Sequence, residues 1–258
     1  MSQFHVPVTD YMTATVHTAS PETTLPEADR MLVAHNISSL AITRDDKLLG
    51  VVSRTDLLHV GTRQAGSRHK AHLLSLPDKP VSEVMTQEVQ TVSPAATLSD
   101  AAKIMQKSRL HRVFVTSDDA LQGVLSPRDF MAAIADKQLN HPISEYMSAP
   151  LFTIRAQEPI STATERLEKA HVTGLVVLDN GWPVGVFTQV EALESRDTER
   201  STPVEQVMSA AFLPLERETP IYRAAAQACA MGVRRIIAVR HGEPVGIVTG
   251  LDFAKAIK

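Results

Sequence analysis

A nine-residue stretch recurs four times along this 258-residue chain and limits its possible folds more than any other feature. The copies are GVVSRTDLL from 50, GVLSPRDFM from 123, GVFTQVEAL from 185 and GIVTGLDFA from 246. A second motif lies upstream of each copy: VTDYMT from 8, VSEVMT from 81, ISEYMS from 143 and VEQVMS from 204. The methionines of this motif, Met12, Met85, Met147 and Met208, each precede the matching glycine by 38 residues. The chain is therefore predicted to contain four copies of one structural unit.

Each unit carries the hydrophobic pattern of a helix placed between short extended segments. In the second unit, Leu98, Ala101, Ala102 and Met105 follow the spacing of an amphipathic helix. Two short apolar runs come next, separated by turn-forming residues, and the second run leads into another helix. The predicted unit is β-α-β-β-α, and the predicted fold class is α/β of the α+β type, with helices over one face of a small sheet.

A unit of roughly 50 residues is too small to bury a stable core alone, because even a domain of about 60 residues buries only about 60% of its unfolded surface. We therefore expect the first unit to pair with the second and the third with the fourth. The expected boundaries are 6–60, 81–137, 142–196 and 203–258. The linker 61–80, which carries Arg63, Arg68, His69 and Lys70, is either a solvated loop or a docking segment.

Composition argues against several classes of function. With 26 basic and 29 acidic side chains and a net charge of −3, nucleic-acid binding is not expected. No apolar run approaches the roughly 18 residues of a membrane span, and the N-terminus lacks a signal-peptide pattern, so we expect a cytoplasmic protein without membrane contact. The single cysteine, Cys229, falls in an apolar helical pattern, where a buried and unreactive thiol is expected.

Motifs for catalysis or metal binding are also missing from the sequence. His69 and His72 supply half of a metal site at most, and no cysteine or acidic pair completes it, so no metal is expected. No phosphate-binding loop, dinucleotide motif or nucleophile elbow points to an enzyme.

The hydroxyl and the acid in each nine-residue copy allow two interpretations. Ser53, Ser126, Thr188 and Thr249 stand where a strand ends and a helix begins, with Asp56, Asp129, Glu191 and Asp252 three residues later. In the first interpretation they form capping boxes, each worth about 1 kcal/mol. In the second, the carboxylate accepts hydrogen bonds from two ribose hydroxyls while the helix end favours a phosphate. Both roles are compatible.

In both motifs and in their spacing, the four copies resemble cystathionine β-synthase (CBS) domains, over about residues 6–258 except the linkers. The resemblance implies two tandem pairs, or Bateman modules, arranged as a pseudo-symmetric disc. It also implies a non-enzymatic regulatory protein that binds AMP, ADP or ATP in clefts between paired motifs and modulates an unidentified partner protein. A regulator that binds S-adenosylmethionine and a structural adaptor with empty clefts are the alternatives, and association of chains into homo-oligomers is left open.

The resemblance also assigns roles to residues. Asp56, Asp129 and Asp252, with their capping hydroxyls, are expected to bind ribose. Positions 26 and 27 after each methionine adjoin the cleft in CBS proteins, and they are basic only in the second and fourth units; the residues are His111, Arg112, Arg234 and Arg235. These residues either form a solvated surface or bind phosphate, since arginine can bind phosphate oxygens in a bidentate manner. One phosphate site is therefore expected in each pair, centred on Asp129 and Asp252, and Arg54 and Arg128 are expected to add to the phosphate contacts.

Two further expectations concern differences between the units. The resemblance implies that Thr18, Thr91 and Thr153, six residues after their methionines, line the edge of an adenine pocket, whereas the fourth unit has Pro214 at this position. The third site, with Thr188 and Glu191, is expected to be weak, because glutamate adds a methylene group and TQVE lacks a basic residue beside the acid.

Overall fold

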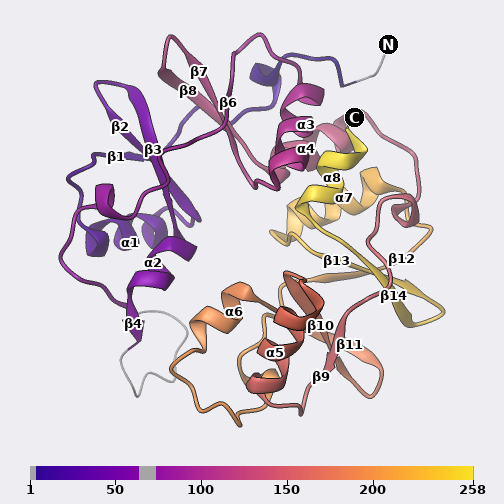
Figure 1. Cartoon of the computed structure of the whole chain (residues 1–258). Coiled ribbons are helices and arrows are strands. Elements are labelled where there is room, and N and C mark those ends of the chain that lie inside the picture. The colour runs from indigo at the N-terminus through magenta and orange to yellow at the C-terminus, as the bar shows by residue number, and fades with distance from the viewer. Residues whose placement is uncertain (1–3, 64–73, 258) are drawn as a thin grey trace. The chain divides into compact units, whose positions relative to one another are not determined.

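The same order of strands and helices recurs four times in the computed structural model, which describes residues 4–63 and 74–257 (Figure 1). The first repeat contains β1 (Thr18–Ala19), α1 (Leu25–Ala34), β2 (Ser39–Arg44), β3 (Lys47–Ser53) and α2 (Arg54–Val60). The second contains β6 (Thr91–Val92), α3 (Leu98–Ser108), β7 (Val113–Ser117), β8 (Ala120–Leu125) and α4 (Pro127–Asp136). The third contains β9 (Thr153–Arg155), α5 (Ile160–Ala170), β10 (Gly174–Asp179), β11 (Trp182–Thr188) and α6 (Gln189–Glu194). The fourth contains β12 (Leu213–Glu216), α7 (Ile221–Met231), β13 (Ile236–Arg240), β14 (Glu243–Val248) and α8 (Gly250–Ala256).

The predicted β-α-β-β-α unit and the mixed α/β class are confirmed. A one-turn 3-10 helix precedes each unit; the four turns are Val8–Asp10, Val81–Glu83, Ile143–Glu145 and Val204–Gln206. In the linker, β4 (Thr62–Arg63) pairs with β5 (Leu74–Ser75). Arg68, His69, Lys70 and His72 lie outside the described residues, so the predicted role of the linker stays a prediction.

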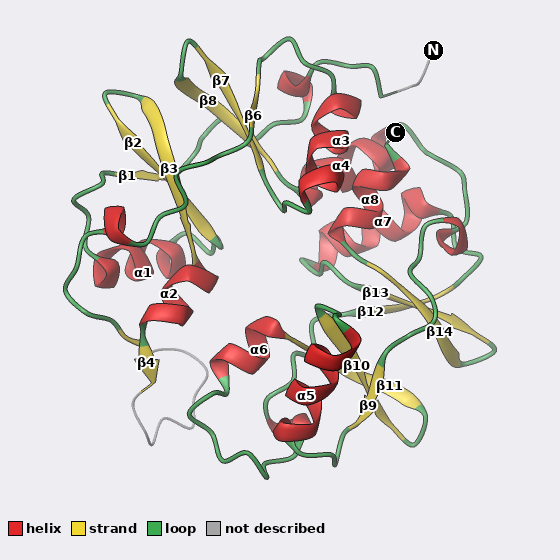
Figure 2. Cartoon of the chain, in the orientation of Figure 1, coloured by secondary structure: helices red, strands yellow, loops and turns green. Residues whose placement is uncertain are grey.

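Strand pairing follows one scheme in every repeat. The first strand pairs in parallel with the second, and the second pairs antiparallel with the third through a hairpin. In the first two repeats the strands join into one six-stranded sheet of order β1-β2-β3-β8-β7-β6, connected through Lys47 and Ala120 at the hairpin tips. Figure 2 shows these strands in yellow, with α1 and α2 beside the strands of the first repeat.

The described residues fall into two compact units. One comprises residues 13–94 and 114–124, and the other comprises residues up to 12, residues 95–113 and residues from 125 onward. The first of these compact units contains an apolar core built around Leu25, Leu32, Leu40 and Leu57 of the first repeat. The second contains a comparable core around Ile160, Leu167 and Phe187 in the third repeat.

The repeated glycine and the repeated methionine meet across paired repeats. A Cβ atom on Gly50 would lie 2.8 Å from Sδ of Met85, and one on Gly185 would lie 2.4 Å from Sδ of Met208. The relation is mutual, because a Cβ on Gly246 would lie 2.4 Å from Sδ of Met147. The glycine of one repeat is thus needed for the close approach of its partner's methionine. These contacts confirm the predicted pairing of the first repeat with the second and of the third with the fourth.

Helices of the second and fourth repeats pack against each other within one compact unit. The helix α4 contacts α7 and α8, and α3 contacts α8, as Figure 2 shows. The predicted stripe on α3 is confirmed, because Leu98, Ala101, Ala102 and Met105 are all fully buried. The sequence did not indicate that these two repeats would share an interface.

Candidate ligand-binding site

A capping box closes the N-terminus of the last helix in all four repeats. In the second repeat, the backbone N–H and the hydroxyl of Ser126 donate to Oδ2 of Asp129 at 2.6 and 2.8 Å. In the fourth, the corresponding groups of Thr249 donate to Oδ2 of Asp252 at 2.7 and 2.8 Å. The first repeat forms the same bonds between Ser53 and Asp56, at 2.8 and 2.7 Å. The capping interpretation is therefore confirmed.

The caps leave part of the carboxylate available for a ligand. At Asp252 both hydrogen bonds go to Oδ2, and among the described residues Oδ1 accepts none. Burial raises the pKa of Asp252, although the bonds from Thr249 and the charge of Lys255 act in the opposite direction. A half-buried oxygen of this kind would gain a hydrogen bond from a ligand hydroxyl.

The third repeat differs from the others in the burial of its acid. Glu191 is only 9% exposed, its Oε2 accepts from the backbone N–H of Thr188 at 2.9 Å, and the hydroxyl of Thr188 donates to the same oxygen. The longer side chain thus folds back onto its own cap. The weak third site remains a prediction, and this burial is its physical basis.

The N-termini of α4 and α8 come into direct contact. A Cβ atom on Gly250 would lie 2.7 Å from both Cβ and Cγ of Pro127, so only glycine fits at the first position of α8. Pro127 is fully enclosed and fits the first turn of α4, where its missing N–H costs nothing. This contact places the caps at Ser126 and Thr249, the residues just before Pro127 and Gly250, near each other.

Four arginines and one histidine lie close enough to interact electrostatically, and we call them the basic cluster; they are His111, Arg112, Arg128, Arg234 and Arg235. Burial lowers the pKa of Arg112 to about 10, with a further contribution from the charge of Arg234. Burial also lowers the pKa of Arg234, as do the charges of Arg128 and Arg235. The second and fourth repeats therefore contribute to one electrostatic site.

The ring of His111 belongs to the same cluster. Burial lowers its pKa, and the charges of Arg112, Arg234 and Arg235 lower it further. Both His111 and Arg234 still expose surface to solvent, so an anion can reach them. The prediction of one phosphate site per pair of repeats stays a prediction, and the packing of α4 on α7 and α8 brings the basic residues of both pairs close together.

Cys229 lies beside the basic cluster rather than in a core. Its Sγ is 4.0 Å from the backbone oxygen of Arg128, and the residue is half-buried, not fully buried as expected. Burial raises the pKa of the thiol, with Arg128 lowering it and Asp129 raising it. The thiol form is therefore favoured, in line with the expected low reactivity.

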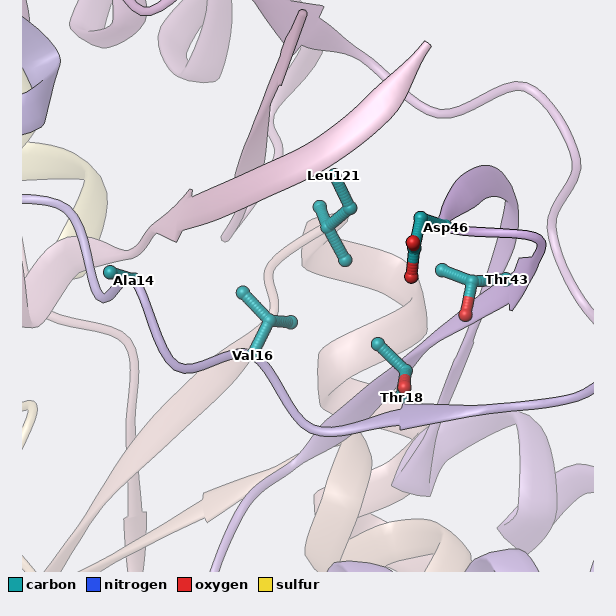
Figure 3. Close-up of a pocket in the computed structure, with 6 residues that line it drawn as sticks. All are labelled: Ala14, Val16, Thr18, Thr43, Asp46 and Leu121. Atoms are coloured by element: carbon teal, nitrogen blue, oxygen red, sulfur yellow. The ribbon is translucent and has the colours of Figure 1, made fainter.

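The threonines predicted to line an adenine pocket occupy equivalent places. Thr18, Thr91 and Thr153 are each the first residue of the first strand in their repeat, and Pro214 lies within β12. Thr18 also lines a pocket together with Ala14, Val16, Thr43, Asp46 and Leu121 (Figure 3). Sequence reasoning did not indicate this pocket, whose lining does not include Arg54 or Asp56 from the cap of the same repeat.

Within residues 4–63 and 74–257, no group of three or more histidine, cysteine, aspartate or glutamate side chains could hold a metal ion. Over the same part of the chain, no helix combines the length and apolar character needed to cross a membrane.

Comparison with known protein families identifies the fold. The family model of the CBS domain matches residues 8–62, 81–136 and 143–196, which is more than half of the chain. The chain belongs to the CBS-domain family. The fourth repeat lies outside these matched residues, yet its strands and helices follow the order of the other three CBS domains.

Curated relatives match this CBS-domain protein over different lengths. YhcV, a CBS domain-containing protein of Bacillus subtilis, is 27% identical over 150 residues, which is 58% of this chain and 96% of YhcV. A 33.4 kDa protein from a ribosomal RNA operon of Thermofilum pendens is 23% identical over 66% of this chain and 57% of its own length. An inosine-5′-monophosphate dehydrogenase of Thermoplasma acidophilum is 31% identical over 45% of this chain, and the match spans 21% of the dehydrogenase.

Solved structures match nearly the whole chain in fold. Protein MJ1225 of Methanocaldococcus jannaschii, a candidate archaeal homologue of γ-AMPK, gives a TM-score of 0.77 at 18% identity and covers 98% of this chain and 100% of that protein. A conserved protein of Pyrococcus horikoshii gives 0.67 at 19% identity, with the same coverage. At these identities the likeness shows the fold alone.

Proposed function

We propose that this CBS-domain protein senses an adenine nucleotide and, without catalysing a reaction, regulates a separate partner protein. The basic cluster carries the proposal, because it gathers cations from the second and fourth repeats beside the capped helix that begins at Pro127. AMP, ADP or ATP supplies the phosphate groups that such a cluster attracts. It also supplies ribose hydroxyls, which can donate hydrogen bonds to the carboxylates of Asp129 and Asp252.

Mutual repulsion within the basic cluster supports an anionic ligand. The lowered pKa values of Arg112 and Arg234 mean that the fold holds these charges partly desolvated and close to other cations. A phosphate would remove this repulsion and gain charge-assisted, bidentate hydrogen bonds from arginine. The N-terminal end of α4 favours negative charge at the same place.

The charge of the cluster also separates the candidate ligands. S-adenosylmethionine carries a positive sulfonium group, so it would add to the repulsion among Arg112, Arg128 and Arg234. An adaptor with empty clefts would need the four acids only as caps, and it would give no reason for gathering four arginines and a histidine. Adenine nucleotides account for both the acids and the cations.

Regulation requires that the nucleotide binds one conformation of the protein better than another. A phosphate held by residues from the second and fourth repeats would stabilise the contact between α4 and α8. A partner protein that recognises either arrangement of these helices would then respond to the nucleotide concentration.

Calorimetric titration with AMP, ADP, ATP and S-adenosylmethionine tests the proposal. Arg234→Gln is expected to weaken nucleotide binding by about tenfold or more, since a hydrogen bond to a charged group contributes about 1.5–3 kcal/mol. Arg240→Gln is the matched control, because Arg240 is an exposed residue at the end of β13 outside the basic cluster. Absence of binding by every nucleotide at millimolar concentration would refute the proposal and favour the adaptor.

A second set of variants separates ribose binding from capping. Asp129→Asn and Asp252→Asn remove a carboxylate that has both roles, whereas Asp100→Asn removes only a cap, since Thr97 and Asp100 form a capping box in α3. All three variants are expected to lose about 0.5–2 kcal/mol of stability, as helix caps do. Only the first two are expected to weaken ATP binding, while binding of tripolyphosphate stays unchanged. Equal weakening of ATP and tripolyphosphate would contradict the ribose role.

A further inference from the structure

A pocket in the first pair of repeats differs in charge from the basic cluster. Its lining consists of Ala14, Val16, Thr18, Thr43, Asp46 and Leu121, and its volume is about 240 Å³. Figure 3 shows the side chains of Thr18, Thr43 and Asp46 grouped toward one end and Ala14 toward the other. All six residues belong to one compact unit of the chain.

The polar side chains of the pocket have unused hydrogen-bonding capacity. Within the part of the chain that the structure describes, the hydroxyls of Thr18 and Thr43 and the carboxylate of Asp46 have no hydrogen-bond or ion-pair partner. The backbone of Asp46 is held in place, because its carbonyl oxygen accepts from the N–H of Leu121 at 3.0 Å. The pocket therefore offers three side-chain acceptors beside apolar groups, two of them on the exposed residues Thr18 and Asp46.

The third repeat has larger apolar residues at two of the positions that line the pocket in the first repeat. In the third repeat, Leu151 and Leu178 stand at the positions of Val16 and Thr43, counted from the repeat methionine. Both leucines pack against an apolar cluster that includes Val176 and Val186. The first repeat thus has smaller and more polar side chains where the third repeat has a filled interior.

The charge around the pocket favours a cation. Two turns with left-handed backbone meet here, and each carries two adjacent aspartates; these are Asp45 and Asp46 in one turn and Asp118 and Asp119 in the other. Hydrogen bonds join the turns, since Leu48 donates to the carbonyl oxygen of Asp119 at 3.1 Å and Leu121 donates to Asp46. The cations next to the first turn are Arg44 and Lys47, and Arg44 pairs with Glu22, so the four aspartates leave a negative balance that would repel a phosphate.

We propose that this pocket binds a small primary amine in its ammonium form. The three N–H groups of an alkylammonium ion match the three acceptors, namely the two threonine hydroxyls and the carboxylate of Asp46. The alkyl chain would contact Val16 and Leu121. The volume is below the 300–1,000 Å³ typical of drug-sized ligand sites, so the ligand has only a few carbon atoms.

Titration with butylamine, followed through the methyl NMR signals of Ala14, Val16 and Leu121, tests the assignment. Saturable shifts are expected with butylammonium. None are expected with butyrate, which lacks the positive charge, or with tetramethylammonium, which lacks N–H donors. Equal shifts with butyrate, or no saturable shift with butylammonium, would overturn the proposal.

Three variants locate the site. Asp46→Asn is expected to weaken binding about tenfold or more, and asparagine tolerates the positive φ of 61° at this position. Asp45→Asn is the matched control, with the same loss of charge at a neighbouring φ of 50°, and should retain binding. Thr43→Leu copies Leu178 and is expected to fill the pocket and abolish the shifts.

If Asp45→Asn weakens amine binding as much as Asp46→Asn, the proposal is wrong, because the loss would then reflect the overall negative charge of the turns and not a contact with Asp46. Adenosine provides the last comparison. If adenosine causes the same shifts and competes with butylamine, the pocket is the adenine edge predicted for Thr18, and the amine assignment is wrong. The outcome does not depend on nucleotide binding at the basic cluster.

Discussion

Replacing the repeated glycine by alanine is expected to destabilise the protein through the partner repeat. In Gly185→Ala, the new methyl group would lie 2.4 Å from Sδ and 2.9 Å from Cγ of Met208, and 3.0 Å from the carbonyl oxygen of Ser209. The methionine can turn away, but the backbone cannot move easily, because Val186 and Ser209 exchange two hydrogen bonds of 2.9 Å. Overpacking of this kind costs about 1–3 kcal/mol.

A double-mutant cycle measures whether the cost arises from the partner's methionine. Urea denaturation followed by circular dichroism gives the stability of Gly185→Ala, Met208→Ala and the double variant. The double variant is expected to lose less than the sum of the single losses, with a coupling of about 0.5–3 kcal/mol. For the mirror pair, Met147→Ala should offset Gly246→Ala in the same way, because Sδ of Met147 lies where that methyl group would be.

The crossed combinations decide the outcome. Met147 belongs to the same repeat as Gly185, so Met147→Ala should not offset Gly185→Ala. If it does so as well as Met208→Ala, the glycine contacts the methionine of its own repeat and the pairing argument fails. Additive losses in both cycles would show that the methionine is not the cause.

Three further predictions concern the site. Because burial and neighbouring cations lower the pKa of His111 below its ordinary 6.5, its charged form is disfavoured until a phosphate binds. Calorimetry should therefore detect proton uptake on nucleotide binding and an affinity that rises between about pH 8 and about pH 6, and His111→Gln should remove both effects. Without nucleotide, the stability of the fold changes with pH in the opposite direction. Because the pKa of His111 is lowered in the folded state, the free energy of unfolding falls as the pH drops below 6.5, which urea denaturation can follow. Gly250→Ala should cost about 1–3 kcal/mol in urea denaturation and weaken ATP binding, and Pro127→Ala should restore part of both, because the clash is with the proline ring; no restoration would contradict the helix contact. Glu191→Gln should cost about 1–2 kcal/mol through its buried cap yet leave ATP affinity unchanged, and a loss of affinity would mean that the third site is occupied.

Features that depend on residues close in sequence could be predicted. The β-α-β-β-α order follows from periodicity within about 50 residues, and each capping box links residues three apart, such as Ser126 and Asp129. The pairing of repeats was also accessible, because four units of this size need partners. The contact that explains the glycine was not predicted, since nothing in the spacing of 38 residues shows that Gly185 faces Met208 rather than Met147.

The pocket lined by Thr43 was out of reach of the sequence for a similar reason. The sequence shows that Val16 and Thr43 of the first repeat correspond to Leu151 and Leu178 of the third. Only the structure shows that the two positions of each repeat lie together, around the pocket in the first repeat and on an apolar cluster in the third. The exposed side of Cys229 was missed because its helix, α7, packs on α4 and leaves the thiol at the edge of that contact.

The contact between the second and fourth repeats places their basic residues in one shared electrostatic environment. As separate pairs, His111–Arg112 and Arg234–Arg235 would be two ordinary phosphate contacts, each serving its own pair of repeats. Because Arg234 lowers the pKa of both Arg112 and His111, the two pairs form one field, and an anion bound by either pair lowers the repulsion felt by the other. A phosphate bound here, as we propose, would therefore stabilise the contact of α4 with α8 as well as interact with its own binding residues. In a protein built from four small repeats, that coupling gives a ligand a direct influence on how the repeats pack, which is the property that a sensor requires.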